Sequence, residues 1–441
     1  MATTSRSSVD AAAYFGDNPA ASRRDLSEIA AGLTGSEILK IAGEVRAMQA
    51  AGQHVLNLTV GDFSPKEFPI PQLLTDETIS ALQSGQTNYP PADGIPELRK
   101  AIQSLYEREL GLRYPLSSIV VQSGGRPGIY AAYRTLLNPG DAVIYAVPSW
   151  NNNYYCQLVG ARPIEIPTRP EDGFLPTAES IAAHIGEARM VVLNTPVNPC
   201  GTVMSAEHLR AICELIVAEN TRRAERGAAA VYLLFDQIYW MLTFGEAHHY
   251  TPLEVMPEMA AYTIIVDGIS KSFAATGLRL GWTVAPPALI ATIKDVVAHV
   301  GAWAPKPIQA ATAELLNDVE TIQEYHAQMK REVQARLAAL YEGFKAMQTA
   351  GLPVECLAPE GAIYLSARIN LLGREVDGTM LGSNEDIRRY VLAAAGFAVV
   401  PFNAFGFREE NGWFRLSVGA VSLQDITDGL PRLQAALERV G

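Results

Sequence analysis

The chain has 441 residues, of which 48% are hydrophobic and 19% are charged, and its formal net charge is −12. This length predicts two or three domains, and the composition excludes a mainly disordered chain. The negative charge disfavours nonspecific binding to nucleic acid, and no apolar stretch approaches the roughly 20 residues that span a bilayer, so we expect a cytoplasmic protein without a membrane partner.

Residues 1–33 are rich in Ala, Ser and charged side chains and show little periodicity, so we interpret them as an N-terminal extension. The segment ILKIAGEVRAMQAAG then predicts an amphipathic helix, HVLNLTVG predicts a strand, and SPKEFPIPQ predicts a loop. We assign residues 34–80 to the N-terminal part of a small domain.

A pattern of strand, turn and helix repeats between about residues 119 and 285. The strand-like runs are short and rich in apolar residues, for example IVVQS, AVIYAVP, RMVVLN, VYLLFD and YTIIVD. Runs that are apolar throughout are typical of strands buried on both faces. The pattern predicts an α/β large domain with a mostly parallel sheet, which we place at residues 81–325.

The pattern changes after Pro305. A long helical stretch leads to the strand AIYLSARI, another helix, the strands FAVVP and WFRLSVG, and a final helix. This order predicts a smaller α+β domain at residues 326–441. The four cysteines and seven histidines lack the spacing of a disulfide framework or of a metal site, so we assign no metal.

The segment DGISKSFAATGLRLGW carries a lysine flanked by small residues and an arginine eight positions later. Desolvation lowers the pKa of an amine, so Lys271 in such surroundings becomes a nucleophile that forms Schiff bases. The planar fork of Arg279 suits a phosphate ester. An amine for an aldehyde beside a cation for a phosphate indicates pyridoxal phosphate. A surface lysine is the alternative, so other segments must decide.

Open α/β sheets bind ligands beyond the carboxyl ends of their strands, and several candidates follow strands here. Gly124 and Gly125 in QSGGRPG let backbone amides approach an anion at a helix N-terminus, or they only make a tight turn. Trp150 in AVPSW can stack on a flat ring or pack in the core.

Two further strand ends carry polar residues. Asn198, between two prolines in LNTPVNPCGTV, can donate to a phenolate oxygen or cap its own loop. Asp236 ends the apolar run VYLLFD and Tyr239 follows three residues later. The buried carboxylate needs a partner, for which a protonated pyridine nitrogen is suitable, or it caps a helix.

In this order and at these separations, the segments resemble the class I/II aminotransferases, the aspartate aminotransferase superfamily of fold type I pyridoxal phosphate enzymes. The resemblance covers nearly everything from about Ser36 to the C-terminus. It implies a large α/β domain with a mostly parallel seven-stranded sheet between helices, a smaller α+β domain, and a homodimer with shared active sites.

The resemblance also implies roles for individual residues. Lys271 would form the Schiff base with the cofactor and later carry a proton. Asp236 would keep the pyridine nitrogen protonated, while Tyr239 and Asn198 would hydrogen-bond the 3′-oxygen and Trp150 would stack on the ring.

The remaining carried-over roles concern the two anionic groups of the ligands. The cofactor phosphate would lie among Arg279, the amides of Gly125 and Arg126, and Tyr89 reaching over from the partner subunit. Arg415 in FRLSVG would grip the substrate α-carboxylate, a task that suits a planar fork of donors.

The backbone amide of Gly61 in LTVGDF would assist that arginine. Some features depart from the family pattern. Gly268 occupies the place where many members carry a hydroxyl three residues before the lysine, and Ser270 lies directly before Lys271, so we expect rearranged phosphate contacts that include Ser270.

The run NNNYY after Trp150 is unusually polar and lies close to where a substrate side chain would be. The substrate specificity of aspartate-specific relatives therefore cannot be assumed for this chain. Candidates for the distal pocket, which would hold the substrate side chain, are Lys306, Trp303, Asn153 and Tyr364. These residues are compatible with a pocket that binds a carboxylate and with one that accepts an aromatic ring.

We therefore predict a pyridoxal-phosphate-dependent aminotransferase that moves an amino group from an aspartate-like or aromatic L-amino acid to a 2-oxo acid such as 2-oxoglutarate, by a ping-pong mechanism. The alternative is a lyase on the same fold, which catalyses C–S β-elimination, cyclisation or decarboxylation. A non-enzymatic regulator is disfavoured, because the segment before the first helix is too short and too little basic for a DNA-binding domain.

Overall fold

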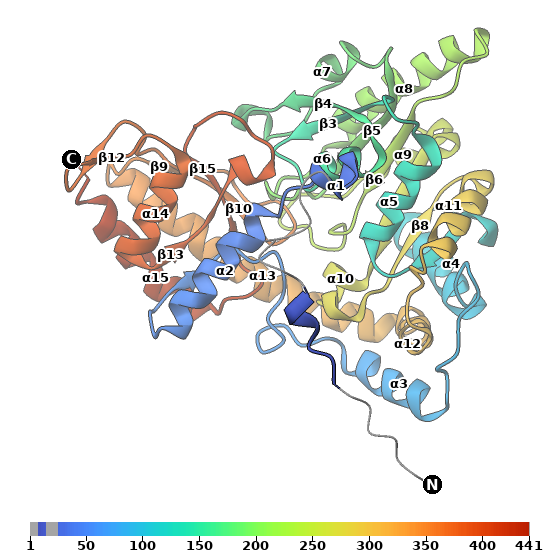
Figure 1. Ribbon diagram of the computed structural model, residues 1–441, viewed down its shortest axis with the longest axis horizontal. Helices are drawn as coiled ribbons and strands as arrows, with labels where there is room; N and C mark the ends of the chain where they lie inside the picture. Colours follow the sequence, from blue (N-terminus) through green and yellow to red (C-terminus); the bar gives the residue numbers. More distant parts are fainter. Residues whose placement is uncertain (1–7, 15–24, 441) are drawn as a thin grey trace.

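The computed structural model describes residues 8–14 and 25–440. These residues form a larger and a smaller part, each with its own sheet, and the two parts lie side by side (Figure 1). Within the described residues, no helix combines the length and the apolar character needed to cross a membrane.

The larger part is built on a seven-stranded sheet with the strand order β2–β8–β7–β6–β5–β3–β4. Neighbouring strands are parallel except for the two pairs that include β8, which confirms the predicted mostly parallel sheet. The strands are β2 (Ile119–Gln122), β3 (Ala142–Val147), β4 (Arg162–Pro167), β5 (Ala188–Asn194), β6 (Tyr232–Asp236), β7 (Thr263–Gly268) and β8 (Gly281–Val284).

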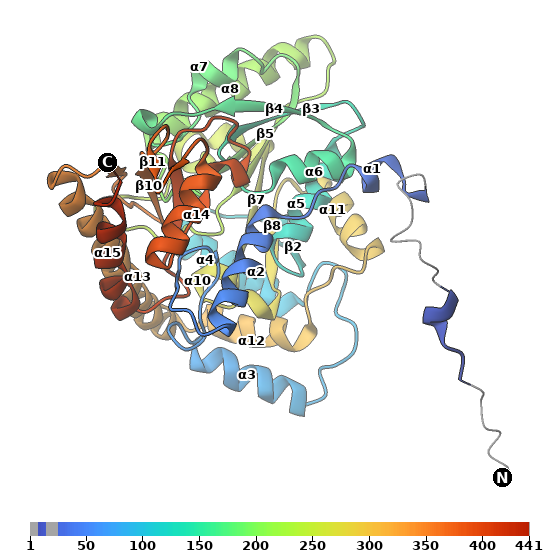
Figure 2. The same ribbon diagram turned by 60° about the vertical axis from the view of Figure 1, so that its left-hand side comes forward.

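Helices cover both faces of this sheet (Figures 1 and 2). Side chains alternate between the two faces of a strand, so Ile264 and Val266 of β7 share a core with α5, α6 and α11, whereas Ile265 shares one with α4 and α12. The helices are α3 (Gln72–Gln83), α4 (Pro96–Leu110), α5 (Gly125–Leu136), α6 (Asn152–Val159), α7 (Ala178–Ala182), α8 (Ala206–Glu225), α9 (Pro252–Val255), α10 (Ile269–Ser272), α11 (Pro287–His299) and α12 (Lys306–Asn317).

The smaller part is built on an antiparallel four-stranded sheet with the order β14–β15–β10–β9. Two short two-stranded pairs, β1–β13 and β11–β12, accompany it. The elements are α2 (Glu37–Ala50), β1 (Leu56–Asn57), α13 (Val319–Thr349), β9 (Val354–Cys356), β10 (Tyr364–Ile369), β11 (Glu375–Val376), β12 (Thr379–Met380), α14 (Asn384–Ala395), β13 (Phe397–Ala398), β14 (Val400–Pro401), β15 (Trp413–Ser417) and α15 (Leu423–Leu437).

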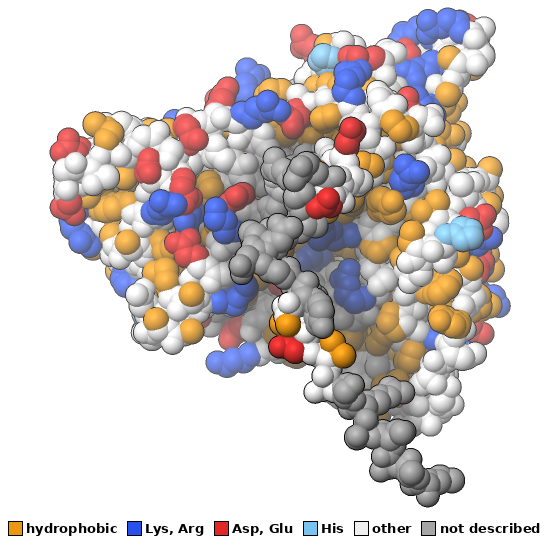
Figure 3. Space-filling view, viewed as in Figure 1, with side chains coloured by type: hydrophobic (Ala, Val, Ile, Leu, Met, Phe, Trp, Pro, Cys, Tyr) orange, Lys and Arg blue, Asp and Glu red, His pale blue; other side chains and the backbone are white. Residues whose placement is uncertain are grey.

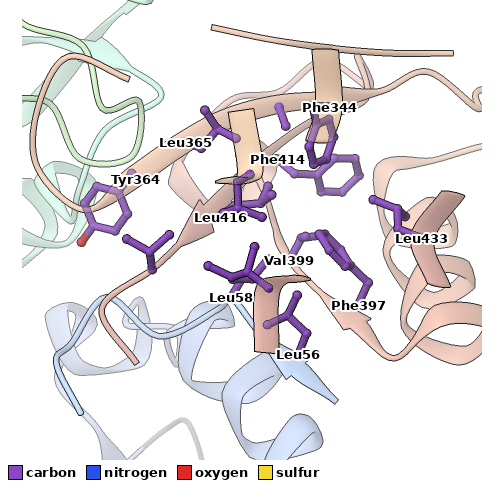
Figure 4. Close-up of a cluster of buried hydrophobic side chains, with 14 of the residues drawn as sticks. Leu56, Leu58, Phe344, Tyr364, Leu365, Phe397, Val399, Phe414, Leu416 and Leu433 are labelled. Atoms are coloured by element: carbon purple, nitrogen blue, oxygen red, sulfur yellow. The ribbon is translucent and has the colours of Figure 1, made fainter. Parts of the chain in front are cut away.

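The N-terminal segment takes part in the core of the smaller part. Leu56 and Leu58 lie among side chains of the C-terminal residues, including Phe344 of α13 and Leu416 of β15 (Figure 4). Tyr364 stands at the edge of the same cluster (Figure 4). Segments from both ends of the chain therefore form one core.

The predicted strand HVLNLTVG is much shorter in the structure. Leu56 and Leu58 donate backbone hydrogen bonds to Gly396 and Ala398, and Ser417 donates to the carbonyl of Leu58. Strand pairing ends there, and the following residues leave the sheet as a loop that leads to the site.

The domain limits at residues 33/34, 80/81 and 325/326 stay predictions. Helix α13 runs without a break across the last of them. Within the predicted extension, residues 28–31 form the short helix α1 (Glu28–Ala31), and Gln157 of α6 donates to the carbonyl of Ile29 at 3.4 Å. Residues 1–7 and 15–24 of that extension lie outside the described residues.

Candidate active site

A cavity of about 480 Å³ lies where the two parts meet, beyond the carboxyl ends of β5, β6 and β7. Figure 3 shows basic side chains gathered in a hollow of this face. Its lining includes most of the residues that the sequence predicted, namely Gly61, Gly125, Arg126, Trp150, Asn198, Asp236, Tyr239, Ser270, Lys271, Arg279 and Arg415.

Lys271 lies in the one-turn helix α10, directly after β7. Its Nζ donates a 2.6 Å hydrogen bond to the carbonyl of Gly61 and lies 5.7 Å from the ring centre of Tyr239. Burial lowers the pKa of this amine to about 8; Arg415 acts in the same direction, while Asp62 opposes the shift. A larger fraction of Lys271 is therefore neutral and nucleophilic near pH 7 than of an ordinary lysine.

Asp236 ends β6 and faces the cavity. Its Oδ1 accepts a 3.1 Å hydrogen bond from the backbone N–H of Ile238. Burial raises the pKa of this carboxyl to about 6, although the N–H of Ile238 and the charge of Lys271 act against the rise. Among the described residues no lysine or arginine forms a salt bridge with it, so the carboxylate suits a cationic or N–H-bearing ligand.

Arg415 on β15 is only 1% exposed, and no acidic residue of the described chain forms a salt bridge with it. Its Nη2 donates to the carbonyl of Thr59 at 2.6 Å and its Nη1 donates to Oδ1 of Asn198 at 3.2 Å, while Nε has no partner. The guanidinium lies 4.8 Å from the ring centre of Tyr364. A buried cation without a counter-ion is unfavourable, so this position favours an anionic ligand.

Two tyrosines and an amide surround the lysine and the arginine. The hydroxyls of Tyr239 and Tyr364 share a 2.6 Å hydrogen bond. The backbone N–H of Asn198 donates to Oδ1 of Asn194 at 2.8 Å, while its side-chain oxygen is used by Arg415. The side-chain NH₂ of Asn198 is left to donate toward a ligand.

An anion-binding corner forms at the N-terminus of α5. Gly124 has φ +88°, a backbone conformation that favours glycine, and a Cβ there would lie 2.5 Å from Nη2 of Arg279 and displace this guanidinium. Arg279 donates to the carbonyls of Thr276 and Ser123 at 2.7 and 3.2 Å. The amides at the helix N-terminus and this cation together suit a phosphate.

Trp150 and Arg126 line the wall of the cavity above this corner. The guanidinium carbon of Arg126 lies 6.0 Å from the ring centre of Trp150, and its Nε donates to the hydroxyl of Tyr155 at 3.3 Å. Arg126 is exposed and forms no salt bridge within the described residues. It is a cation at the cavity wall that a second anionic group could reach.

Some predicted residues lie outside the cavity of this chain. Tyr89 is 81% exposed and packs edge-on against Trp303 with ring centres 5.3 Å apart. Lys306 donates to Oδ1 of Asn88 at 2.7 Å, and Asn153 is exposed on α6. Of the four distal candidates, only Tyr364 lines the cavity.

The sequence analysis missed several lining residues. Asp62 and Thr276 both line the cavity, and the Thr276 hydroxyl donates to Oδ1 of Asp62 at 2.6 Å. Their positions beside Gly61 and three residues before Arg279 were the available signal. Helix α2 borders the cavity through Ile38, Leu39, Ala42 and Arg46, which its amphipathic pattern alone could not indicate.

Comparison with known proteins identifies the family of this chain. The sequence model of the family "Aminotransferase class I and II" matches residues 53–433. The aspartate aminotransferase of Rhizobium meliloti is 32% identical over 92% of this chain and 94% of that protein.

Solved structures are similar over nearly the whole chain. The aspartate aminotransferase of Thermus thermophilus, solved with maleate, has a TM-score of 0.83 and 27% identity over 93% of this chain and 99% of that one. The aromatic aminotransferase of Pyrococcus horikoshii has a TM-score of 0.78 and 25% identity over 90% and 98% of the two chains. These relatives are named for transamination, which favours amino-group transfer over the lyase alternative. The chain therefore belongs to the class I and II aminotransferase family, and it is an enzyme that transfers amino groups.

Proposed function

We propose that this chain binds pyridoxal 5′-phosphate in the cavity and transfers an amino group from an L-amino acid to a 2-oxo acid such as 2-oxoglutarate. Its family is known to use this cofactor. The observation that carries the proposal is the meeting, in one cavity, of an amine with a lowered pKa, a half-buried carboxylate and an anion-binding corner.

The residues present fit the cofactor group by group. Lys271 offers a neutral amine to the aldehyde, Asp236 offers a carboxylate to the pyridine nitrogen, and Arg279 with the α5 N-terminus offers donors to the phosphate. Trp150 offers an aromatic face to the ring. When bound, pyridoxal phosphate supplies an aldehyde that condenses with amines and a pyridinium ring that withdraws electrons.

Lys271 has two tasks in this proposal. Its neutral Nζ would bind the aldehyde of the cofactor, and the amine, when free, would take the proton from the substrate α-carbon. Desolvation serves both tasks because it lowers the pKa of the amine to about 8, so that a larger fraction of it is uncharged near neutral pH than of an ordinary lysine. Asp236 would hold a proton on the ring nitrogen, and the Tyr239 hydroxyl would donate to the phenolic oxygen.

Arg415 supports an amino acid as the substrate. Its guanidinium is buried, has no acidic partner in the described chain and has an Nε without a hydrogen bond. A substrate α-carboxylate would supply the missing charge and accept from the open donor edge. Asn198, which already holds Nη1, keeps the guanidinium in place.

We propose an aspartate-like donor for the side-chain pocket. Arg126 at the cavity wall has no acidic partner in the described chain, and a second carboxylate would pair with it. The named specificities of the Rhizobium meliloti and Thermus thermophilus relatives support this choice, because aspartate and maleate both carry two carboxylates. An aromatic donor is the second candidate, supported by the Pyrococcus horikoshii relative and by the rings of Trp150 and Tyr364.

We also propose a homodimer in which Tyr89 reaches the phosphate of the partner subunit. Tyr89 is exposed here and lies outside the cavity of its own chain. A phenol that is 81% exposed has room to donate to a group on another chain.

Lys271 is the first residue to test. Borohydride treatment of the protein with pyridoxal phosphate is expected to leave a pyridoxyl mark on the peptide that contains Lys271. Lys271→Ala should remove the mark and lower kcat by at least about 10³-fold, because both the nucleophile and the base are lost. Lys294 on α11 pairs with Asp295, and Lys294→Ala is the matched control. This variant should keep the pyridoxyl mark and the wild-type kcat. A mark on a different lysine would contradict the proposal.

The second prediction concerns pH. The neutral amine is the reactive form, so the rate at which cofactor-free protein takes up pyridoxal phosphate should rise with pH up to about 8 and then level off. An ordinary lysine would continue to gain reactivity to about pH 10. Stopped-flow absorbance measures the rate, and a lysine analogue in solution corrects for the ionisation of the cofactor. Asp62→Asn removes a carboxylate that favours the charged amine and should move the break to lower pH.

The third prediction separates the two carboxylate sites. Arg415→Lys should lower kcat/KM on the order of 100-fold for every amino acid, because a point charge cannot replace a buried fork of donors. Arg126→Gln should lower it about tenfold for aspartate and glutamate only. Half-reactions with a panel of amino acids, followed by visible absorbance, measure both. Equal losses for phenylalanine and aspartate in Arg126→Gln would leave the aromatic donor as the better proposal.

The fourth prediction concerns the dimer. Tyr89→Ala should weaken retention of pyridoxal phosphate about tenfold, since one charge-assisted hydrogen bond is lost. Mixing Tyr89→Ala chains with Lys271→Ala chains should restore retention in the sites that combine Lys271 of one chain with Tyr89 of the other. Gel filtration follows the assembly, and a monomer with full activity would argue against it.

A further inference from the structure

Asp267 is a buried carboxylate that the proposed function does not use. It lies on β7 four residues before Lys271 and is 0% exposed. Val266 pairs with Asp236 across the sheet and lines the cavity, so the next residue of the strand points to the opposite face. Asp267 therefore faces α4, on the side of the sheet away from the cavity.

Four neutral donors surround this carboxylate. Its Oδ2 accepts from the Tyr106 hydroxyl at 3.0 Å, from Trp240 Nε1 at 2.9 Å and from Gln237 Nε2 at 3.5 Å. Its Oδ1 accepts from the backbone N–H of Gly268 at 2.7 Å. Within the described residues no lysine or arginine pairs with it. The hydrogen bonds that it accepts from the described residues all come from neutral groups.

These donors belong to the two segments that carry Tyr239 and Lys271. Gln237 and Trp240 flank Tyr239 in the loop after β6, and Gly268 is the N-cap residue of the turn α10 that carries Lys271. Asp267 thus joins the loop of the tyrosine to the turn of the lysine. Tyr106 holds the same carboxylate from α4.

Tyr239 and Lys271 have no direct hydrogen bond that could fix their separation. The amine lies 5.7 Å from the centre of the tyrosine ring. Backbone pairing between their segments ends with the N–H of Gln237 on the carbonyl of Val266 at 3.1 Å. Beyond that bond, the carboxylate of Asp267 is the next link between the two segments.

We propose that Asp267 is a positioning residue for the transfer reaction, and that its carboxylate fixes the Tyr239 loop relative to the Lys271 turn from the far face of the sheet. This inference rests on the proposed function, because the proposed function assigns Tyr239 and Lys271 their roles toward the cofactor.

The carboxylate form matters because every neighbour is a donor. An amide at this position has one oxygen, so its NH₂ would face either the backbone N–H of Gly268 or, in the other orientation, the donors of Tyr106, Gln237 and Trp240. Burial raises the pKa of Asp267 to about 7, and the hydrogen bonds from Gly268, Tyr106, Gln237 and Trp240 act against that rise. The titratable groups that face it are Tyr106 directly and His249 through the amide of Gln237, at 3.4 Å.

The test uses the cofactor-loaded protein and the isosteric variant Asp267→Asn beside Asp267→Ala. On the proposed function, Tyr239 would donate to the phenolic oxygen of the cofactor and favour its anionic form, so a displaced Tyr239 should raise the pH at which the visible absorbance titrates, by about half a pH unit or more. The kcat should fall about tenfold, while KM for the amino acid changes less than about threefold, because Arg415 lies on the other part of the molecule.

Trp240→Phe removes one donor and should shift the titration in the same direction by a smaller amount. Glu219→Gln on α8 is the matched control: this carboxylate is 4% exposed, pairs with Arg222 and Arg223, and lies outside the cavity. It should lower the stability of the protein without moving the titration or kcat.

The outcomes separate this inference from the function on which it rests. Wild-type protein that takes up no pyridoxal phosphate would overturn the proposed function and the inference together. Wild-type protein that takes it up, with Asp267→Asn and Asp267→Ala titrating at the wild-type pH and keeping kcat, would overturn only the role of Asp267. Loss of stability alone in these variants would likewise show a purely structural residue and overturn the inference.

Discussion

The desolvated amine of Lys271 is the constraint on which the site depends. Lowering its pKa requires removal from water, and that enclosure involves both parts of the molecule: Gly61 of the N-terminal segment accepts its hydrogen bond, and α10 of the larger part carries it. The charged groups around the amine shift its pKa in opposite directions. Arg415 lowers its pKa while Asp62 and Asp236 raise it, so burial decides the result.

The same enclosure explains why the contacts between the two parts are tight. The loop that carries Asn198 touches the start of β10: the amides of Glu360 and Gly361 donate to the carbonyl of Gly201. A Cβ on Gly201 would lie 2.2 Å from the carbonyl oxygen of Tyr364, so only glycine allows this approach. Asn198 and Arg415 can share a hydrogen bond because these two backbones meet.

The sequence predicted the larger part well because its strands are apolar runs that end in polar residues. Asp236 and Asn198 were predicted from such ends. Lys271 and Arg279, predicted from their spacing, both line the one cavity. Periodicity could not show which face of β10 carries Tyr364. Residues on both faces of this strand are buried, so its sequence gives no alternation of apolar and polar residues.

Long-range packing set the limit elsewhere. The border that α2 makes with the cavity depends on contacts between the two ends of the chain, which spacing does not encode. The surroundings of Asp267 are of the same kind, because its donors are as far away as Tyr106 in sequence.

Helix α13 has a consequence for how the two parts hold together. Its first turns supply Ile322 to the core beneath the seven-stranded sheet, and later turns supply Leu340 and Phe344 to the core of the smaller part. Loss of order in either core removes packing from a helix that the other core needs. The packing of α13 therefore couples the stability of the two halves.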